Sequence, residues 1–190
     1  MRKFFTGFFF FLLTISAHGQ EVHSPKKISE NKIKIDGIID PIEWEGAIKI
    51  ELDNETEPGY NIKPIVNTTG YILYSEYHVY LRFEAETKET VRASIRKRDD
   101  TGIFNDDIVG IDIDTYRDGR NNLFIGSNAY GSQVDVRVMN ALQEESRYDM
   151  SFDLEYESAG SIIGNSYIVE MKIPFSSLPF PNGKNQKWKF

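Results

Sequence analysis

The sequence has no cysteine and only seven prolines among its 190 residues. Without cysteine the chain cannot form a disulfide framework, so its stability must come from buried side chains or bound ions. It also lacks any long window in which apolar residues recur at the 3.6-residue spacing of an amphipathic helix. These absences exclude a disulfide-rich scaffold and a helical bundle.

Long apolar runs are scarce, and the one that is present lies at the N-terminus. The mainly apolar run from Phe4 to Ile15 follows the basic pair Arg2 and Lys3, which is the layout of a secretory signal peptide. The run is shorter than the roughly 20 residues that a transmembrane helix needs. We predict a signal peptide at residues 1–19 and a secreted mature chain in a bacterial periplasm, outer membrane or cell surface. No later stretch could cross a membrane as a helix, so an integral helical membrane protein is not expected.

Positive charge is also in short supply. Removing residues 1–19 leaves 20 basic residues against 29 acidic ones, a net charge of −9. Such a chain repels nucleic acid and anionic lipid surfaces, and it suits neutral ligands and metal cations. The roughly 170 remaining residues fit one domain of ordinary size.

What the sequence has in abundance is alternation with a period of two, which is typical of strands. Tyr77, Val79, Leu81 and Phe83 alternate with more polar residues, and this pattern predicts a strand at residues 77–84. Further strands are predicted at residues 32–36, 47–52, 69–75, 108–114, 123–128, 132–138, 152–156 and 167–173. Turn signals separate them, so the predicted fold class is all-β: an antiparallel β-sandwich with one or two short helical turns.

The ten residues IDGIIDPIEW at positions 35–44 predict a corner of this fold. The Asp-Gly pair ends a strand with a residue that tolerates positive φ, and the Asp-Pro pair begins a helical turn with an N-cap and a first-position proline. A glutamate three residues after that cap is placed to complete a capping box. We interpret six of these residues as structural and expect the tryptophan to close one end of the sandwich, with ligand contact as the alternative: Asp36, Gly37, Asp40, Pro41, Glu43 and Trp44.

The order of these segments resembles the family 9 carbohydrate-binding modules, which belong to the DOMON-like β-sandwiches. IDGIIDPIEW is followed by the strand at 77–84, by DIVGIDID at 107–114 and by GNSYIVEMKIPFSSL from Gly164. Their order and spacing over nearly all of residues 20–190 are similar to those of the family. The resemblance implies a jelly-roll-type sandwich that binds sugars. It also implies a chain truncated at its C-terminal end, the first part of a larger exported protein in which a further β-rich domain follows.

The resemblance also implies where an oligo- or polysaccharide would bind. The family places an aromatic platform in the loop before the DIVGIDID strand, where this chain has Phe104 instead of tryptophan, and a second platform beyond Phe190. Flat aromatic faces pack against sugar C–H groups, while charged and amide side chains bond the hydroxyls. The candidate ligand-binding residues are Phe104, Arg98, Asp106, Tyr116, Asn128 and Tyr130, with Arg96 beside them; a solvated loop rim is the alternative.

Carboxylates are densest between residues 99 and 118. Asp112 and Asp114 lie two residues apart on a predicted strand, which separates them by about 7 Å on one face, and Asp118 follows in the next turn. Oxygen ligands of this kind are what Ca²⁺ requires, although the spacing is not that of an EF-hand. These three residues are therefore the candidate ligands of a calcium ion, and ordinary solvated acids are the alternative.

Catalytic functions find less support. Glycoside hydrolysis needs two carboxylates at a fixed separation, which so acidic a sequence cannot reveal. A lone core-region histidine, His78, provides neither a catalytic triad nor a zinc site, and no methionine is spaced as its partner in haem ligation. No catalytic residue is predicted, and any O-glycosyl hydrolase activity is expected outside this chain.

The sequence therefore predicts a noncatalytic carbohydrate-binding domain that serves glycan binding or carbohydrate catabolism in a larger exported protein. One alternative is a structural or interaction domain that binds no sugar and packs against a following β-rich domain. Another is an accessory part of a glycoside hydrolase whose catalytic residues lie outside this chain.

Overall fold

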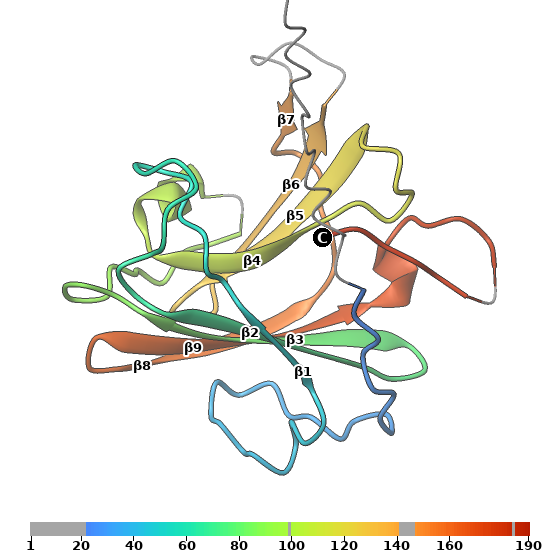
Figure 1. The fold of residues 1–190 in the computed structure, drawn as a ribbon, viewed down its shortest axis with the longest axis horizontal. Coiled ribbons are helices and arrows are strands. Elements are labelled where there is room, and N and C mark those ends of the chain that lie inside the picture. Colours follow the sequence, from blue (N-terminus) through green and yellow to red (C-terminus); the bar gives the residue numbers. More distant parts are fainter. Residues whose placement is uncertain (1–21, 99, 141–146, 184) are drawn as a thin grey trace, which may run out of the picture.

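The computed structural model describes residues 22–98, 100–140, 147–183 and 185–190. Within these ranges, nine strands form two antiparallel sheets that face each other (Figure 1). The predicted all-β sandwich is therefore confirmed, whereas the predicted signal peptide lies outside the described residues. In the same ranges, no helix is long and apolar enough to span a membrane.

The two sheets differ in size. The larger sheet has the order β1 (Ile48–Glu51), β2 (Thr68–Tyr74), β3 (His78–Glu86), β9 (Ser166–Pro174) and β8 (Glu157–Ile163). The smaller sheet has the order β4 (Ile108–Ile113), β5 (Asn121–Asn128), β6 (Gln133–Met139) and β7 (Tyr148–Asp149). The described ranges also contain two short 3₁₀ helices, η1 (Thr101–Asn105) and η3 (Phe175–Ser177), which agree with the one or two short helical turns expected, although neither lies at residues 40–44.

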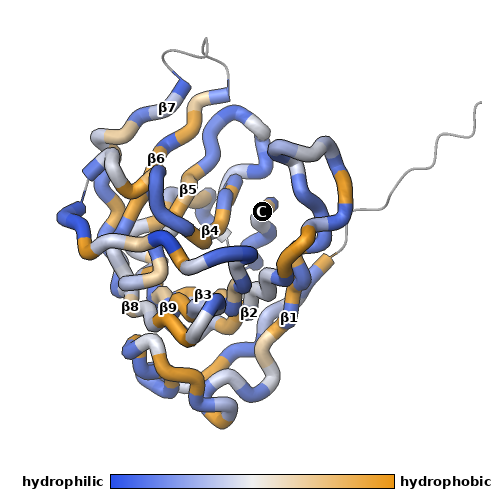
Figure 2. The backbone as a smooth tube through the Cα atoms, turned by 90° about the vertical axis from the view of Figure 1, so that its left-hand side faces the viewer, coloured by the Kyte–Doolittle hydropathy of each residue, from blue (hydrophilic) through white to orange (hydrophobic). Residues whose placement is uncertain are grey.

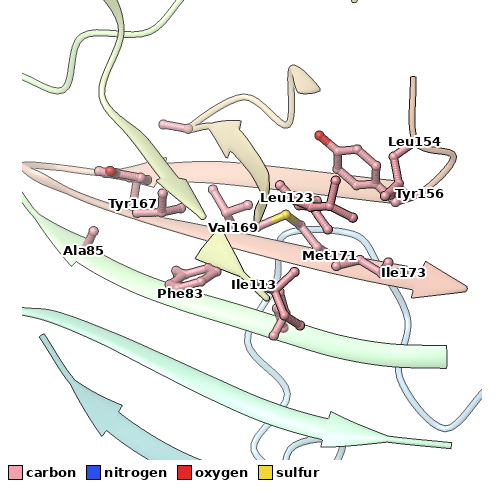
Figure 3. Close-up of a cluster of buried hydrophobic side chains, with 14 of the residues drawn as sticks. Phe83, Ala85, Ile113, Leu123, Leu154, Tyr156, Tyr167, Val169, Met171 and Ile173 are labelled. Carbon is pink, nitrogen blue, oxygen red and sulfur yellow. The ribbon is translucent and has the colours of Figure 1, made fainter. Parts of the chain in front are cut away.

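The main core lies between the sheets. Leu81 and Phe83 of β3 pair with Met171 and Val169 of β9, and all four side chains are buried. Figure 3 shows Phe83 and Met171 among side chains from the smaller sheet, such as Ile113 and Leu123. Burial of each such side chain stabilises the fold by about 1.5–3 kcal/mol.

The outer face of the larger sheet is covered as well, which the alternating pattern did not predict. Leu73 of β2 and Tyr80 of β3 pack against Ile28, Ile33 and Trp44 in a second buried cluster. These last three come from residues 22–46, which run beneath the larger sheet in Figure 1. The polar-looking side of the 77–84 strand is therefore buried, whereas Tyr77, expected inside, is exposed.

The outer face of the smaller sheet is also apolar. Val134, Val136 and Val138 of β6 pack there with Ile103 of η1 and Phe124 of β5. Figure 2 shows hydrophobic residues alternating with hydrophilic ones along β6. Since the β6 valines face outward, Gln133, Asp135 and Arg137 of this strand face the larger sheet.

Two predicted strands are absent from the structure. Residues 32–36 are irregular with two bends, because the Asp36 N–H donates to the Glu170 carboxylate and not to a neighbouring strand. Residues 152–156 alternate in burial, but the Leu154 N–H donates to the Asp135 carboxylate, and the segment pairs with no strand. Conversely, β7 and β8 were not predicted.

Small residues explain why β8 escaped prediction. Its sequence ESAGSII has no apolar alternation. Two turns pack against its two faces, and small residues are needed where their backbones approach. A Cβ atom on Gly37 would lie 2.8 Å from the Gly160 backbone, and one on Gly131 would lie 3.0 Å from Ala159. Glycine is required at both turns because each also has a positive φ, 73° at Gly37 and 82° at Gly131.

The corner at residues 35–44 differs from its prediction in three ways. Asp40 Oδ1 does accept from the Ile42 N–H at 2.8 Å, as an N-cap would, but Pro41 and the residues after it form turns and not a helix. No capping box forms, because Glu43 Oε2 lies 3.4 Å from the Lys34 amide. Trp44 is buried on the outer face of the larger sheet and does not close the end of the sandwich.

Candidate functional site

A hollow of about 300 Å³ lies where β5 ends and β6 begins. It is lined by Ile95, Arg96, Arg98, Tyr130, Gly131, Ser132 and Gln133, and we call this set the rim site. Tyr130 is 50% exposed and Ile95 is more exposed still. The site therefore offers an open aromatic side chain beside two guanidinium groups.

The turn that carries Tyr130 is held by Asn128, which is completely buried. Asn128 Oδ1 accepts from the N–H groups of Tyr130 and Ser132, both at 3.0 Å. The Gly131 N–H donates to the Asn128 carbonyl at 2.9 Å and closes the turn. A side-chain amide that replaces backbone partners in this way is typical of Asn at tight turns.

Arg96 is fixed by a bidentate pair with Asp106. Its Nε and Nη2 atoms lie 2.7 and 2.8 Å from the two carboxylate oxygens of Asp106. Asn128 Nδ2 and the Ser94 N–H also donate to Asp106, at 2.8 and 3.2 Å. The hydrogen bonds from Arg96 outweigh burial and lower the pKa of the Asp106 carboxyl to about 2. Asp106 is therefore ionised throughout the physiological range and orients the guanidinium.

Arg98 is held from several directions. Its Nη2 donates to Asp135 Oδ1 at 2.7 Å and to the Leu154 carbonyl at 2.6 Å, and its Nη1 donates to Gln133 Oε1 at 3.1 Å. Its Nε donates to Asp153 at 3.1 Å. Burial raises the pKa of Asp135, while the Leu154 N–H and Arg98 act in the opposite direction. Because these contacts are already formed, little side-chain entropy remains to be lost when a ligand contacts Arg98.

The charges of the rim site are compensated within the protein. Arg96 faces Asp106, and Arg98 faces Asp135 and Asp153, so the hollow presents polar N–H groups without a net positive charge. Asp106 and Asp135 are each occupied by arginine and backbone donors. The arrangement can hold a neutral, hydroxyl-rich molecule against an aromatic ring, and its carboxylates serve to position the arginines.

The predicted ligand residues are only partly brought together. Arg98 and Tyr130 line the hollow, whereas Asp106 and Asn128 lie behind it as supports. Phe104 is exposed on η1 but is not among the lining residues.

Tyr116 lies beyond the opposite end of β4 from the rim site. The six residues of β4, at about 3.3 Å each, put roughly 20 Å between the two ends of this strand. Tyr116 therefore does not belong to the rim site.

Sequence reasoning missed Ile95, Gln133 and Asp135. Asp135 had a usable signal, since it is an acid between valines on a predicted strand. Its face was nevertheless taken for the solvent side. Ile95 and Gln133 carried no comparable signal.

The three acids proposed as calcium ligands have different environments. Asp114 is buried, and its two carboxylate oxygens accept from the N–H groups of Tyr116, Arg117 and Gly119 at 2.7–3.1 Å. Asp118 accepts from the Arg120 N–H, and Asp112 is exposed on β4. Among the residues that the structure describes, no three His, Asp or Glu side chains are grouped so as to hold a metal ion. Calcium binding stays an untested prediction.

No protein-family model and no curated protein matches the sequence. Solved structures do match. A "putative carbohydrate-binding protein" from Bacteroides uniformis aligns with a TM-score of 0.58 and 16% identity, over 81% of this chain and 75% of that chain. The chain shares the fold of this protein. At this identity the likeness extends to the fold alone, and to that extent the predicted resemblance is confirmed.

Two further structures are of a family 9 carbohydrate-binding module from Caldicellulosiruptor kristjanssonii. The complex with cellotriose aligns with a TM-score of 0.48 and 16% identity, over 87% of this chain and 74% of that chain. The complex with glucose aligns with a TM-score of 0.47 and 16% identity, over 86% of this chain and 75% of that chain.

Proposed function

We propose that this domain binds carbohydrate at the rim site and does not act on it chemically. The observation that carries the proposal is the half-exposed ring of Tyr130 beside Arg96 and Arg98, whose guanidinium groups are already fixed. A sugar has an apolar C–H face for the ring and hydroxyl groups for the N–H donors. A site with both features, and without net positive charge, suits a neutral glycan.

The size of the site limits what it can hold. About 300 Å³ is at the lower end of the range for ligand sites, so a chain end or a short stretch of a glycan is the ligand that fits. The Bacteroides uniformis protein with this fold is described as carbohydrate-binding, which supports a sugar-binding role here.

We further propose that the domain belongs to a larger exported protein that acts in glycan binding or carbohydrate catabolism. The signal-like N-terminus supports secretion to the periplasm, outer membrane or cell surface. In such a protein the domain would hold a following β-rich domain close to the glycan.

Calorimetry with a panel of soluble neutral oligosaccharides tests the proposal. We expect binding that weakens about tenfold in Tyr130→Ala, a loss of about 1.4 kcal/mol. Tyr116→Ala is the matched control, because Tyr116 is 52% exposed but lies beyond the far end of β4. This variant should keep the affinity of the unaltered protein.

Two outcomes would contradict the proposal. No heat with any sugar at up to about 1 mM, which corresponds to about 4 kcal/mol of binding, would favour a structural or interaction domain. Release of reducing sugar by the purified chain would show hydrolysis and overturn the noncatalytic role.

A further inference from the structure

Two apolar side chains stand at the opening of the rim site, whose remaining side chains are polar. Tyr130 and Ile95 are 50% and 86% exposed, whereas the other lining side chains belong to arginine, serine and glutamine. One C–H face of a pyranose ring is enough to cover the ring of Tyr130. Ile95 is therefore left to contact a second apolar group of the ligand.

Ile95 is held in place although it is exposed. On one side of it, the Ser94 carbonyl accepts from Asn128 Nδ2 at 2.7 Å. On the other side, the Arg96 N–H donates to Ser132 Oγ at 3.0 Å. The backbone around Ile95 is thus tied to the turn that carries the rim site, and a β-branched side chain has few χ1 rotamers. Little conformational entropy is lost when a ligand covers such a side chain.

The polar part of the hollow offers a donor beside this apolar contact. A guanidinium group has five N–H donors. Four of those of Arg98 are engaged, one from Nε, one from Nη1 and two from Nη2. Among the described residues, none accepts from the second N–H of Nη1, and the Arg98 side chain is 31% exposed. A single outward donor of this kind suits a single acceptor on the ligand, such as an amide carbonyl.

Charge favours a neutral substituent. Arg98 is paired with Asp135 and Asp153, so neither a carboxylate nor an ammonium group on the sugar would meet an uncompensated charge. An acetamido group is neutral, and it carries a carbonyl and a methyl on the same carbon atom. Arg98 and Ile95 line one hollow of about 300 Å³, as recognition of two such adjacent groups requires.

We propose that the rim site recognises a sugar unit that bears an N-acetyl group, with the methyl against Ile95 and the carbonyl accepting from Arg98 Nη1. The inference rests on the proposed carbohydrate binding and names the class of sugar, an N-acetylhexosamine. In this arrangement Tyr130 stacks on the ring of any sugar, whereas Ile95 and Arg98 select the substituent.

Competition and saturation-transfer NMR with methyl glycosides test the proposal. The ligands are glucose, N-acetylglucosamine, N-formylglucosamine and 6-deoxyglucose, with the matching galactose series. We expect the better N-acetyl sugar to bind about tenfold more tightly than its parent sugar, a difference of about 1.4 kcal/mol. The N-formyl sugar lacks only the methyl group and should bind about fourfold more weakly than the N-acetyl sugar. The acetyl methyl protons should receive strong saturation from the protein.

An isoleucine variant tests the methyl contact. Ile95→Ala should reduce the preference for N-acetyl over N-formyl from about fourfold to nearly equal binding, because the methyl loses its apolar partner. Ile42→Ala is the matched control, since Ile42 is 73% exposed but lies in the corner at residues 35–44, outside the rim site. This variant should keep the fourfold preference. A ratio of two affinities is not altered by a change in the fraction of folded protein.

Four results would overturn the inference, and they separate it from the proposed function. Equal binding of parent and N-acetyl sugars, lost together in Tyr130→Ala, would remove the acetamido specificity and leave carbohydrate binding in place. A 6-deoxy sugar that binds as tightly as the N-acetyl sugar would assign Ile95 to a ring methyl. A preference for N-acetyl over N-formyl that survives Ile95→Ala would exclude this contact. Absence of binding by every sugar would overturn both proposals.

Discussion

Two turns dock on β8 from opposite faces, and they lead to different kinds of site. The carbonyl of Gly37 accepts from Ser161 Oγ at 2.5 Å, and the carbonyl of Gly131 accepts from Ser158 Oγ at 2.7 Å. Both glycines have positive φ and lie against the Ala159–Gly160 backbone. Both turns are therefore held to β8 in the same way, by a positive-φ glycine whose carbonyl accepts a serine hydroxyl of the strand.

The difference lies in what each turn positions. The Gly37 turn leads to Trp44, which is 4% exposed and donates from Nε1 to the fully buried Glu170 at 3.0 Å. The Gly131 turn presents Tyr130 to solvent beside arginines that face carboxylates. A buried charge by itself thus marks no function; the two turns differ in the exposure of the neighbouring aromatic ring, and only the exposed ring is open to a ligand.

Removal of Trp44 should give the largest effect and the clearest contrast. Trp44→Ala deletes a buried aromatic side chain and leaves the Glu170 carboxylate with one donor fewer, so we expect a loss of about 4 kcal/mol in the free energy of unfolding. Tyr130→Ala should cost less than about 0.5 kcal/mol, as surface substitutions usually do. Urea denaturation measures both. Similar losses in the two variants would contradict the assignment of one turn to packing and the other to binding.

Gly160→Ala tests whether both turns depend on β8. A Cβ atom at Gly160 would lie 2.6 Å from the Ala129 carbonyl oxygen, which is backbone and cannot move freely. We expect a loss of about 1–3 kcal/mol, the usual cost of overpacking. Gly164→Ala is the control for steric contact, since nothing lies within 4 Å of a Cβ there; it tests positive φ alone. A Gly160→Ala protein as stable as the unaltered chain would show that close docking on β8 contributes nothing.

The two buried carboxylates should respond to acid in opposite directions. Hydrogen bonds from Arg96 lower the pKa of Asp106 to about 2, so its contribution is complete above the unfolded pKa near 4 and is lost as pH falls toward 2. The shift corresponds to about 2 kcal/mol. Burial raises the pKa of Glu170, so this residue makes the fold less stable as pH rises from the unfolded value through the folded one.

Variants separate the two contributions. Asp106→Asn should remove the loss of about 2 kcal/mol in the free energy of unfolding between pH 4 and 2. Glu170→Gln should instead remove the loss of stability that ionisation of Glu170 causes as pH rises. Urea denaturation at a series of pH values measures both slopes. An Asp106→Asn protein whose stability still falls by the same amount in acid would refute the Arg96–Asp106 assignment.

The sequence predicted the fold because its strands keep a period of two, but it could not show which faces are buried. The alternation of Val134 and Asp135 would be the same whether the valine or the aspartate faced the larger sheet. Their faces are decided by η1 and by Arg98, which come from more than 30 residues earlier in the chain. The burial of Glu170 likewise depends on Trp44, 126 residues away.

The candidate site was predicted only where local chemistry is specific. Asn128 and Tyr130 stand at a turn that the sequence marks with glycine, and the structure places both in that turn beside the rim site. Tyr116 was expected in a loop next to the others, but the register of β4 with β5 places it beyond the other end of the strand. Spatial grouping of loops depends on this register, which residue types do not specify.

Calcium should make the smallest difference. Asp114 resembles Glu170 in this comparison, because its buried carboxylate is bound by backbone N–H groups, and a cation would have to displace these donors. We therefore expect Ca²⁺ and a chelator to give unfolding midpoints that agree closely. A specific site at a hundredfold excess over its dissociation constant would instead stabilise the fold by about 2.7 kcal/mol. If Ca²⁺ does stabilise the fold by that amount and Asp112→Asn removes the effect, the carboxylates at this end of β4 form a metal site. The comparison of Asp114 with the buried, hydrogen-bonded carboxylate of Glu170 would then be wrong.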